Sequence, residues 1–391
     1  MVQINRKLKV AVLSRNFSAH MGGAENYAVS LTEKIAQHHE VQVFCQTSDV
    51  RNAAIRIHKM PFSLKKPRWV NMLMFSAWTG LKTRHGFDIV HSHENVFHGN
   101  VHTFHVKPMS FNLFQSPHPA KWMTWLKIAT SPRLISYLWV EHRRVIATSP
   151  RLLMTASALL KQIYIDTFKI PQNSVQVLTP GVNLPSPKLA DAVHDQSHDR
   201  ALLGLPKNQY LLLMVGHNYE KKGLATLLNA LTLLPENVSA VVVGDPSHIT
   251  KWKKRCQGLN IADRVFFLGK QTEMAAVYRA SDCLVHATLE DVFPIVILEA
   301  MAHCLPVVVS PAPYCLSSDL LSPNTNAIVL KDPQDAAALS AHIVFLMANR
   351  QKSQAMAEAG FEFSKSYDWG HLAQNQMDMY IQFLEETHAS S

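Results

Sequence analysis

The amino-acid sequence predicts an α/β protein built from two doubly wound, parallel-sheet domains. Short runs rich in β-branched residues alternate with stretches of helical periodicity, which is typical of parallel strands connected by helices. This alternation occurs twice in the 391 residues, and a segment without apolar periodicity separates the two series. At about 150 residues per domain, the length also favours two domains.

The first series begins with an expected strand at 9–13, which is followed by an expected helix at 25–37. Two further strands are expected at 41–45 and 88–91. In the second series the same reasoning predicts strands at 210–215, 240–244, 264–268, 283–286 and 306–310.

The segment 184–200 is rich in Pro, Ser, Asp and His, and we expect it to be an exposed linker. After residue 333 the chain reads as mostly helical, and apolar residues recur at roughly helical spacing in 368–386. We therefore expect a first domain at 1–185, completed by a helix at 368–391 that packs back on it. The second domain is expected at 200–367.

The composition favours a globular protein, because 47% of the residues are hydrophobic and only 17% are charged. No run of about eighteen uncharged apolar residues occurs, so a membrane-spanning helix is not expected. The five scattered cysteines form no C-x-x-C pair, which disfavours a disulfide framework and a zinc site and favours the reducing cytoplasm. A net charge of +9 favours an anionic partner: a nucleotide diphosphate, an anionic lipid surface or nucleic acid.

Ligands of open parallel sheets bind beyond the carboxyl ends of the strands, so the loops after strands are candidate sites. Gly22 and Gly23 follow the first strand and open a helix whose free N–H groups favour an anion. A tight turn without a ligand is the alternative. In the second series Lys221 and Lys222 follow Gly216 in a loop, where a lysine is suited to pair with a diphosphate leaving group. Here the alternative is a solvated turn.

Two carboxylates flank a helix that is expected to begin near Ile295. Asp291 precedes this helix, and Glu299 lies about two helical turns after Asp291. The two carboxylates are therefore suited to hold sugar or ribose hydroxyls while the helix N-terminus holds phosphate. A capping Asp and a solvated Glu would give the same spacing. Because Glu299 lies among apolar residues, where an unpaired carboxylate is costly, the binding interpretation gains support.

Histidines are concentrated between residues 91 and 105. Their spacing favours strand-end residues that point into a cleft, and a metal site is the disfavoured alternative. The sequence has no P-loop and no G-x-S-x-G motif, which disfavours P-loop NTP hydrolysis and acyl hydrolysis.

Two stretches, 64–84 and 121–144, combine Trp with Lys and Arg. This composition is typical of helices at a membrane interface. Packed core helices of similar composition are the alternative for both.

The segment 291–310, D-V-F-P-I-V-I-L-E-A-M-A-H-C-L-P-V-V-V-S, resembles the donor-site signature of glycosyltransferase family 4. The resemblance extends to G-G-A-E near the start, T-P-G-V-N at 179–183 and G-x5-K-G at 216–223, and so covers most of the chain. It implies the GT-B fold, in which two Rossmann-like domains face each other across a cleft. It also implies a transferase that retains the anomeric configuration and needs neither a metal nor another cofactor.

Carried over position by position, the resemblance implies that Glu299 holds the ribose, Asp291 holds the donor sugar and Lys222 neutralises the diphosphate. Lys221 and Lys222 together resemble an Arg-Lys pair of lipopolysaccharide-type members. The implied donor-binding set is Gly22, Gly23, Gly216, Lys221, Lys222, Asp291, Phe293, Ile295, Val296 and Glu299.

In the first domain, Gly22 and Gly23 would let the backbone approach the diphosphate. His105, in a T-F-H segment, resembles the histidine that lies near the reacting sugar in this family, with His102 as the alternative. The implied catalytic residues are therefore His105, Asp291 and Lys222.

The sequence departs from the family pattern in its donor-site loops. Asp291 replaces the usual Glu, His217 stands where Arg is common, and Cys304 replaces a glycine. Cys315 opens a turn in which a glycine is frequent but missing. The last two departures put the local turns in question, although not the fold.

The implied reaction moves a sugar from a nucleotide-diphosphate sugar, with UDP favoured, to a hydroxyl of a glycan or lipid-linked acceptor. Bacterial-type cell-surface polysaccharide or lipopolysaccharide synthesis is the expected setting. We expect a cytoplasmic protein with an anionic membrane surface as a further partner and no bound nucleic acid. A nucleotide-sugar epimerase of the same architecture, a basic nucleic-acid-binding protein and an inactive scaffold are the alternatives.

Overall fold

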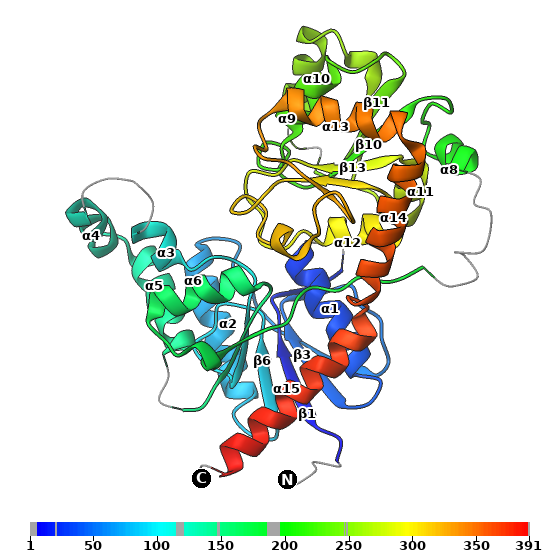
Figure 1. Cartoon of the computed structure of the whole chain (residues 1–391). Coiled ribbons are helices and arrows are strands. Elements are labelled where there is room, and N and C mark those ends of the chain that lie inside the picture. Colours follow the sequence, from blue (N-terminus) through cyan, green and yellow to red (C-terminus); the bar gives the residue numbers. More distant parts are fainter. Residues whose placement is uncertain are drawn as a thin grey trace. The chain divides into compact units, whose positions relative to one another are not determined.

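The computed structural model describes residues 6–19, 22–114, 121–146, 149–185, 196–245, 247 and 249–389. The chain divides into two compact units (Figure 1). Unit 1 comprises Met1–Pro180 together with Trp369–Ser391, and unit 2 comprises Gly181–Asp368. No helix among the described residues combines the length and the apolar character that crossing a bilayer requires.

Unit 1 is organised around a seven-stranded parallel sheet with the strand order β5-β3-β1-β6-β7-β8-β9. From β1 the chain first builds outward through β3 and β5, and then returns to build the other side from β6. The point between β1 and β6 is therefore a topological switch point. The strands are β1 (Lys9–Leu13), β3 (Glu40–Cys45), β5 (Ile55–Lys59), β6 (Ile89–Ser92), β7 (Val101–Phe104), β8 (Leu152–Thr155) and β9 (Val175–Val177).

Alternate residues of β1 pack on opposite faces of this sheet, as the two-residue period of a strand requires. Val10 and Val12 belong to a core shared with α1 and α15, whereas Ala11 and Leu13 pack in a core with Phe75 of α2. A small pair, β2 (Asn16–Phe17) and β4 (Thr47–Ser48), lies outside the main sheet. The helices of unit 1 are α1 (Gly23–Ile35), α2 (Arg68–Lys82), α3 (Met109–Phe114), α4 (Lys121–Ala129), α5 (Pro132–Val145), α6 (Ala158–Phe168), the 3₁₀ turn η1 (Gln172–Ser174) and α15 (Trp369–Ala389).

The C-terminal helix α15 packs against α1 of unit 1, which confirms that the end of the chain returns to the first domain. Trp369 at its start is 1% exposed, and its ring meets the edge of Tyr27 on α1 with centroids 5.8 Å apart. Figure 1 shows α15, in red, beside the first strands of the chain, in blue.

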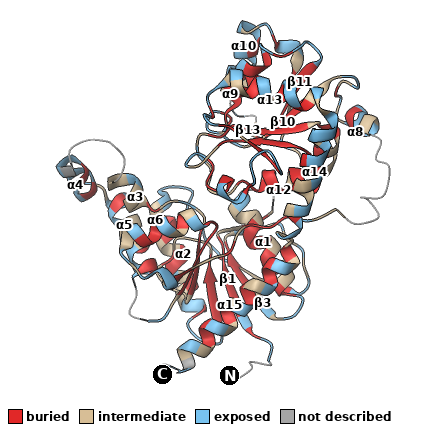
Figure 2. Cartoon of the chain, viewed as in Figure 1, coloured by how far each residue is buried: buried red, intermediate tan, exposed pale blue. Residues whose placement is uncertain are grey.

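Unit 2 contains a six-stranded parallel sheet with the order β12-β11-β10-β13-β14-β15. Its switch point lies between β10 and β13, and Figure 2 shows both strands as buried. The strands are β10 (Tyr210–Val215), β11 (Val238–Val243), β12 (Val265–Gly269), β13 (Cys283–His286), β14 (Val307–Val309) and β15 (Ile328–Val329). The helices are α8 (Gln196–Leu202), α9 (Leu224–Leu231), α10 (Ile249–Gly258), α11 (Met274–Ala280), α12 (Ile295–Ala302), α13 (Ala336–Ala348) and α14 (Arg350–Lys365), with 3₁₀ turns η3 (Ala262–Arg264) and η4 (Ser318–Leu320).

The expected linker 184–200 is wrong at its carboxyl end, because Gln196 already begins helix α8. Asp199 and Arg200 of this helix are buried. Each is paired with a residue of unit 2: Arg279 Nε lies 2.8 Å from Asp199, and Arg200 Nη2 lies 2.7 Å from Asp282. Charges that suggested a solvated linker therefore hold a helix in place. Residues 186–195 lie outside the described residues.

The turn after α12 keeps its shape although Cys304 stands where the family has glycine. Cys304 adopts the left-handed conformation with φ 54°. Its N–H donates to the carbonyl of Met301 at 2.9 Å, and the N–H of Leu305 donates to the carbonyl of Ala300 at 2.9 Å. These two bonds form a Schellman motif, which a glycine would adopt with less strain.

Candidate functional site

The two loops at the switch point of unit 2 are joined by backbone contacts. β10 and β13 pair side by side, so the loops that follow them, 216–223 and 287–294, begin at the same edge of the sheet. The N–H of Leu289 donates to the carbonyl of Lys221 at 2.7 Å, and the hydroxyl of Thr288 donates to the same carbonyl at 3.0 Å. Gly223 makes this approach possible, because a Cβ there would lie 1.9 Å from the carbonyl oxygen of Ala287.

Lys222 and Asp291 form an ion pair between these loops, through Nζ and Oδ2. The side chain of Lys222 passes over Gly216, where an added Cβ would lie 2.6 Å from its Cγ. His286, the last residue of β13, approaches the same Oδ2 through Nε2 at 3.1 Å. A cation, a carboxylate and an imidazole thus meet at the carboxyl end of the sheet.

The backbone of Asp291 is fixed independently of its side chain. Its N–H donates to the carbonyl of Tyr314 at 2.7 Å, and its carbonyl accepts from the N–H of Leu316 at 2.9 Å. Burial alone would raise the pKa of the Asp291 carboxyl, but the hydrogen bond and charge of His286, with the charge of Lys222, hold that pKa below its usual value. Asp291 is therefore an anchored, ionised carboxylate.

Glu299 lies on α12 and has a different environment. Its Oε2 accepts a hydrogen bond of 2.6 Å from the hydroxyl of Tyr278 on α11, whose ring stacks on His303 with centroids 5.1 Å apart. Burial raises the pKa of Glu299, and the hydrogen bond from Tyr278 opposes that rise. Oε1 accepts no hydrogen bond within the described part of the chain, so it is available to a hydroxyl of a ligand.

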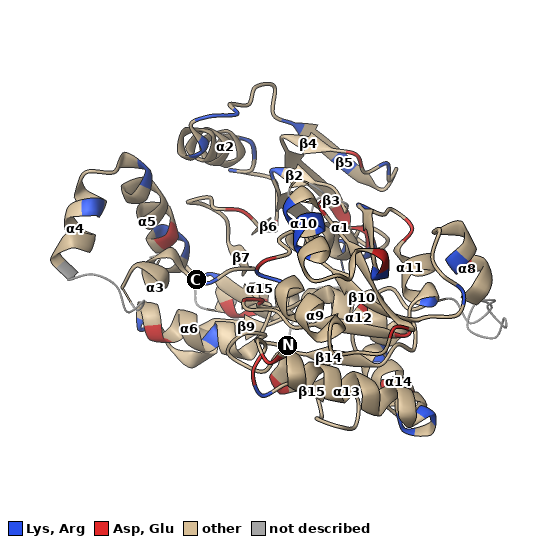
Figure 3. Cartoon of the chain, turned by 90° about the horizontal axis from the view of Figure 1, so that it is seen from above, with Lys and Arg blue, Asp and Glu red and all other residues tan. Residues whose placement is uncertain are grey.

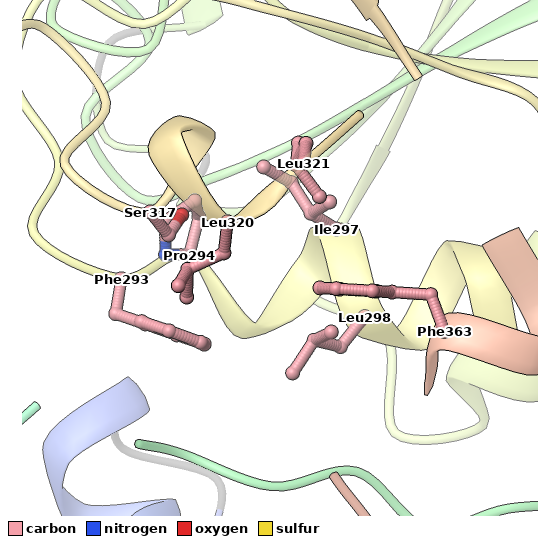
Figure 4. Close-up of a pocket in the computed structure, with 8 residues that line it drawn as sticks. All are labelled: Phe293, Pro294, Ile297, Leu298, Ser317, Leu320, Leu321 and Phe363. Atoms are coloured by element: carbon pink, nitrogen blue, oxygen red, sulfur yellow. The ribbon is translucent and has the colours of Figure 1, made fainter. Parts of the chain in front are cut away.

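Helix α12 begins at Ile295, with Pro294 as the preceding cap residue, as the sequence predicts. Phe293 and Pro294 line an apolar pocket together with Ile297 and Leu298 of the same helix (Figure 4). Ile295 is buried and Val296 is partly exposed. The pocket lining contains no charged side chain, which makes it chemically distinct from the Lys222–Asp291 pair.

Lys221, the neighbour of Lys222, is directed to solvent. Its Nζ lies 2.5 Å from Glu290 Oε2, and both side chains are more than half exposed. His217, at the position where the family commonly has Arg, is exposed too.

In unit 1, the predicted glycine pair lies at the start of α1, as expected. Gly22 is the cap residue and Gly23 the first helical residue. A Cβ on Gly22 would lie 2.8 Å from the carboxylate of Glu25. Residues 20 and 21, which precede the pair, are outside the described residues.

The histidine-rich segment of unit 1 forms a chain of contacts at the ends of β6 and β7. His91 is fully buried between the Tyr380 hydroxyl, 2.6 Å from Nδ1, and the Thr103 hydroxyl, 2.7 Å from Nε2. His93 Nδ1 lies 3.2 Å from His105 Nε2, and the His105 ring also meets the edge of Tyr27, with centroids 5.0 Å apart.

Burial, followed by the charge of Arg144, lowers the pKa of His105 to about 4. Its ring is therefore neutral near pH 7 and can either donate or accept a hydrogen bond. His105 is partly exposed, whereas His102 is fully buried and neither of its ring nitrogens has a hydrogen-bond partner in the described structure. This difference favours His105 over His102 as the residue that a ligand can reach. In the described parts of the chain, no three His, Cys, Asp or Glu side chains come together to hold a metal ion.

Sequence reasoning missed His286 and Tyr278. His286 ends an expected strand, one residue before the loop that carries Asp291, and this position was the available signal. Tyr278 gave no comparable signal, because α11 was not among the expected elements.

Two family models match the chain in succession. Residues 21–185 match the model described as Glycosyltransferase Family 4, and residues 195–363 match the one described as Glycosyl transferases group 1.

Among curated proteins, the chain is 26% identical to D-inositol 3-phosphate glycosyltransferase of Salinispora tropica over 263 residues, or 63% of this chain and 54% of that protein. It is 30% identical over 158 residues to the UDP-Gal:alpha-D-GlcNAc-diphosphoundecaprenol alpha-1,3-galactosyltransferase of Escherichia coli, which covers 39% of each. The aligned regions thus span about half of these relatives or less.

The crystal structure of WaaG, a glycosyltransferase involved in lipopolysaccharide biosynthesis, superimposes with a TM-score of 0.80 at 20% identity. The superposition covers 95% of this chain and 99% of WaaG. This likeness confirms the predicted GT-B class of two parallel-sheet α/β domains. Because the two family models together match residues 21–185 and 195–363, the chain is a member of glycosyltransferase family 4.

Proposed function

We propose that this protein transfers a sugar from a nucleotide-diphosphate sugar to a hydroxyl of a glycan or lipid-linked acceptor, without a metal and with retention of the anomeric configuration. The observation that carries the proposal is the meeting of Lys222, Asp291 and His286 at the switch point of unit 2. Open α/β sheets bind nucleotides at such points. A lysine held there by a carboxylate is suited to exchange that partner for a diphosphate.

Each predicted donor-binding residue has a role that its surroundings support. Lys222 neutralises the diphosphate, Asp291 binds hydroxyls of the sugar, and Glu299 binds the ribose through its available Oε1. Gly216 leaves room for the lysine side chain. Lys221 is an exposed second cation near the same loop, and Phe293, Ile295 and Val296 shape the beginning of α12.

In unit 1, Gly22 and Gly23 offer backbone N–H groups at the start of α1, where the helix dipole favours an anion. His105 supplies a neutral imidazole that hydrogen-bonds the donor sugar. Catalysis then rests on stabilising the leaving diphosphate by Lys222 and backbone N–H groups, while the acceptor hydroxyl attacks from the side on which the diphosphate departs. No protein nucleophile takes part.

The donor is a UDP-sugar in this proposal. Support comes from the galactosyltransferase relative, whose name includes UDP-Gal as well as a diphosphoundecaprenol-linked sugar. The same relative supports a lipid-linked acceptor, and we propose cell-surface polysaccharide or lipopolysaccharide synthesis as the setting.

A screen of UDP-, GDP- and ADP-sugars by thermal shift tests the choice of donor. A ligand at 100 times its Kd stabilises the native state by about 2.7 kcal/mol, which is readily measured. We expect UDP-sugars alone to raise the melting temperature, in buffer with a metal chelator as well as without it. NMR of the product tests the stereochemistry: an anomeric proton with the configuration of the donor is expected. An inverted product or an absolute need for a divalent cation would overturn the corresponding part of the proposal.

An anionic membrane surface, on the cytoplasmic side, is a further partner in this proposal, and helix α4 supplies the contact. Trp122 and Trp125 are 66% and 61% exposed, and Leu126 beside them is 58% exposed. Exposed Trp139 of α5 adds a third aromatic ring, and Figure 3 shows Lys and Arg on both helices. This combination of exposed aromatic and basic side chains suits the headgroup region of an anionic bilayer.

In the other Trp-rich stretch, 64–84, helix α2 packs one face on the core instead. In α2, Phe75 is 1% exposed and lies in a buried cluster against which Trp78 packs. Sedimentation with vesicles of anionic or zwitterionic lipid tests the α4 surface. We expect anionic vesicles to bind the protein and Trp122→Ser/Trp125→Ser to weaken that binding, while Leu233→Ser, at an exposed leucine of unit 2, does not. Equal binding by all three proteins would contradict the assignment.

A further inference from the structure

We propose that His286 is a positioning residue for Asp291: it holds Oδ2 of the carboxylate and keeps Asp291 in place when Lys222 turns to the diphosphate of the donor. The inference rests on the proposed function, because it concerns the same donor site. The family resemblance and the comparisons assign no role to this histidine.

His286 is rigidly placed by the sheet. It is 1% exposed at the end of β13 and lies in register with Val309 of β14. Its carbonyl accepts the N–H of Ser310 at 3.1 Å. The backbone of His286 is therefore held by β14, and Nε2 reaches Asp291 without a change in the strand.

Both partners of Asp291 use the same oxygen. Lys222 Nζ and His286 Nε2 each contact Oδ2, and Oδ1 accepts no hydrogen bond in the described part of the structure. The carboxylate is thereby oriented with one oxygen held by the protein and the other available to a sugar hydroxyl. A hydrogen bond to a carboxylate requires a proton on Nε2 of His286.

The two partners differ in how easily they can leave. Lys222 is 22% exposed and has a long flexible side chain, whereas the imidazole of His286 is 1% exposed. A diphosphate that arrives beside Lys222 competes with Asp291 for its charge. A largely buried carboxylate that lost its only partner would be strongly destabilised. Because His286 remains, Lys222 can turn to the donor while Asp291 keeps its orientation.

The nitrogen on the far side of the His286 ring is consistent with this role. Nδ1 is buried and has no hydrogen-bond partner among the described residues. A proton on Nδ1 would therefore lack an acceptor, whereas a proton on Nε2 is placed to be donated to Asp291. The hydrogen bond from Nε2 therefore orients Oδ2 of Asp291.

Substitutions of His286 in the full chain provide the test, with turnover of a UDP-sugar as the assay. His286→Leu removes the donor, and His286→Gln restores an N–H near Nε2. Loss of a hydrogen bond to a charged group corresponds to roughly 10–100-fold in rate. We expect kcat to fall by that factor in the Leu variant and to recover largely in the Gln variant, while the Kd for UDP stays within about threefold of the wild type.

A double-mutant cycle separates positioning from a general structural effect. In an Asp291→Asn background, His286→Leu is expected to add little further loss, because the group that it positions has already changed. A full additional loss in that background, or normal turnover by His286→Leu alone, would overturn the inference and leave the proposed function intact. Absence of any transfer by the wild-type chain, by contrast, would contradict the proposed function itself.

A second measurement does not depend on whether His286→Leu folds. In a Lys222→Ala variant, carbon NMR of the Asp291 carboxyl reports its pKa directly. If His286 holds the carboxylate without help from the lysine, this pKa stays below its ordinary value. A pKa that rises above the ordinary value in Lys222→Ala would contradict the inference.

Discussion

Replacing Cys304 by glycine should stabilise unit 2, because the native backbone of this residue is left-handed at φ 54°. A side chain in this conformation costs roughly 1–2 kcal/mol, which glycine avoids. Glycine in turn makes the unfolded chain more flexible, which offsets about 0.4–1 kcal/mol of the gain. Cys304 is exposed, so its side chain contributes no core packing that the substitution would remove. The net stabilisation should be about 0–1.6 kcal/mol, with a central value of about 0.8 kcal/mol.

Differential scanning calorimetry measures this gain. For a unit of this size, 1 kcal/mol corresponds to roughly 2–4 °C, so the transition of unit 2 should rise by about 1–4 °C. Cys304→Ala is the matched control: it removes the thiol but keeps a Cβ, and it should not raise the transition. An unchanged or lower transition in Cys304→Gly, or an equal rise in both variants, would refute the reasoning from backbone strain.

Three other predictions concern stability. Gly223→Ala should cost about 2–5 kcal/mol in urea unfolding, because its φ is 80° and the new Cβ would overlap the carbonyl of Ala287. The control Gly204→Ala has a φ of 66° but open space around the new Cβ, so it should cost only about 1–2 kcal/mol. Trp369→Ala should cost about 3–5 kcal/mol through loss of core packing. A loss of less than about 1 kcal/mol in the same assay would contradict the packing of α15 on unit 1. Unit 1 should lose stability as pH falls from about 6.5 to 4. Burial lowers the pKa of His91 to about 3 and the pKa values of His98 and His105 to about 4. As pH falls, the unfolded chain therefore protonates these histidines before the folded unit does. Chemical unfolding of unit 1 with equal free energies at pH 7 and pH 5 would exclude this linkage.

The alternating pattern of strands and helices was predictable because buried parallel strands are short apolar runs with little local ambiguity. β1 and β10 match their expected ranges, and β13 does too. The linker was misplaced because isolated charges resemble a solvated segment, and only the folded unit reveals that Arg200 pairs with Asp282. Composition could not separate α2 from α4 either, since both mix Trp with basic residues, although α2 buries Phe75 and α4 leaves Trp122 and Trp125 exposed.

The candidate donor-site residues were predicted one by one, but their contacts were not. Lys222 and Asp291 are 69 positions apart, and nothing local indicates that they form an ion pair. His286 was missed because a histidine that ends a strand is usually a core residue, and its role depends on a hydrogen bond across a loop. Cys304 raised doubt about a turn that in fact keeps its shape, since a residue other than glycine can adopt the left-handed conformation at a modest cost.

The most direct test of the account is the transfer of a labelled sugar from a UDP-sugar to a lipid-linked glycan acceptor, by the wild-type protein and by Lys222→Ala. Lys253→Ala, at an exposed lysine of the same unit, is the control. Removing the cation that stabilises the leaving diphosphate should slow transfer by at least about 100-fold, as loss of one preorganised charge-stabilising group typically does. The wild-type and Lys253→Ala proteins should transfer at equal rates. Full activity of Lys222→Ala at saturating donor would contradict the central claim.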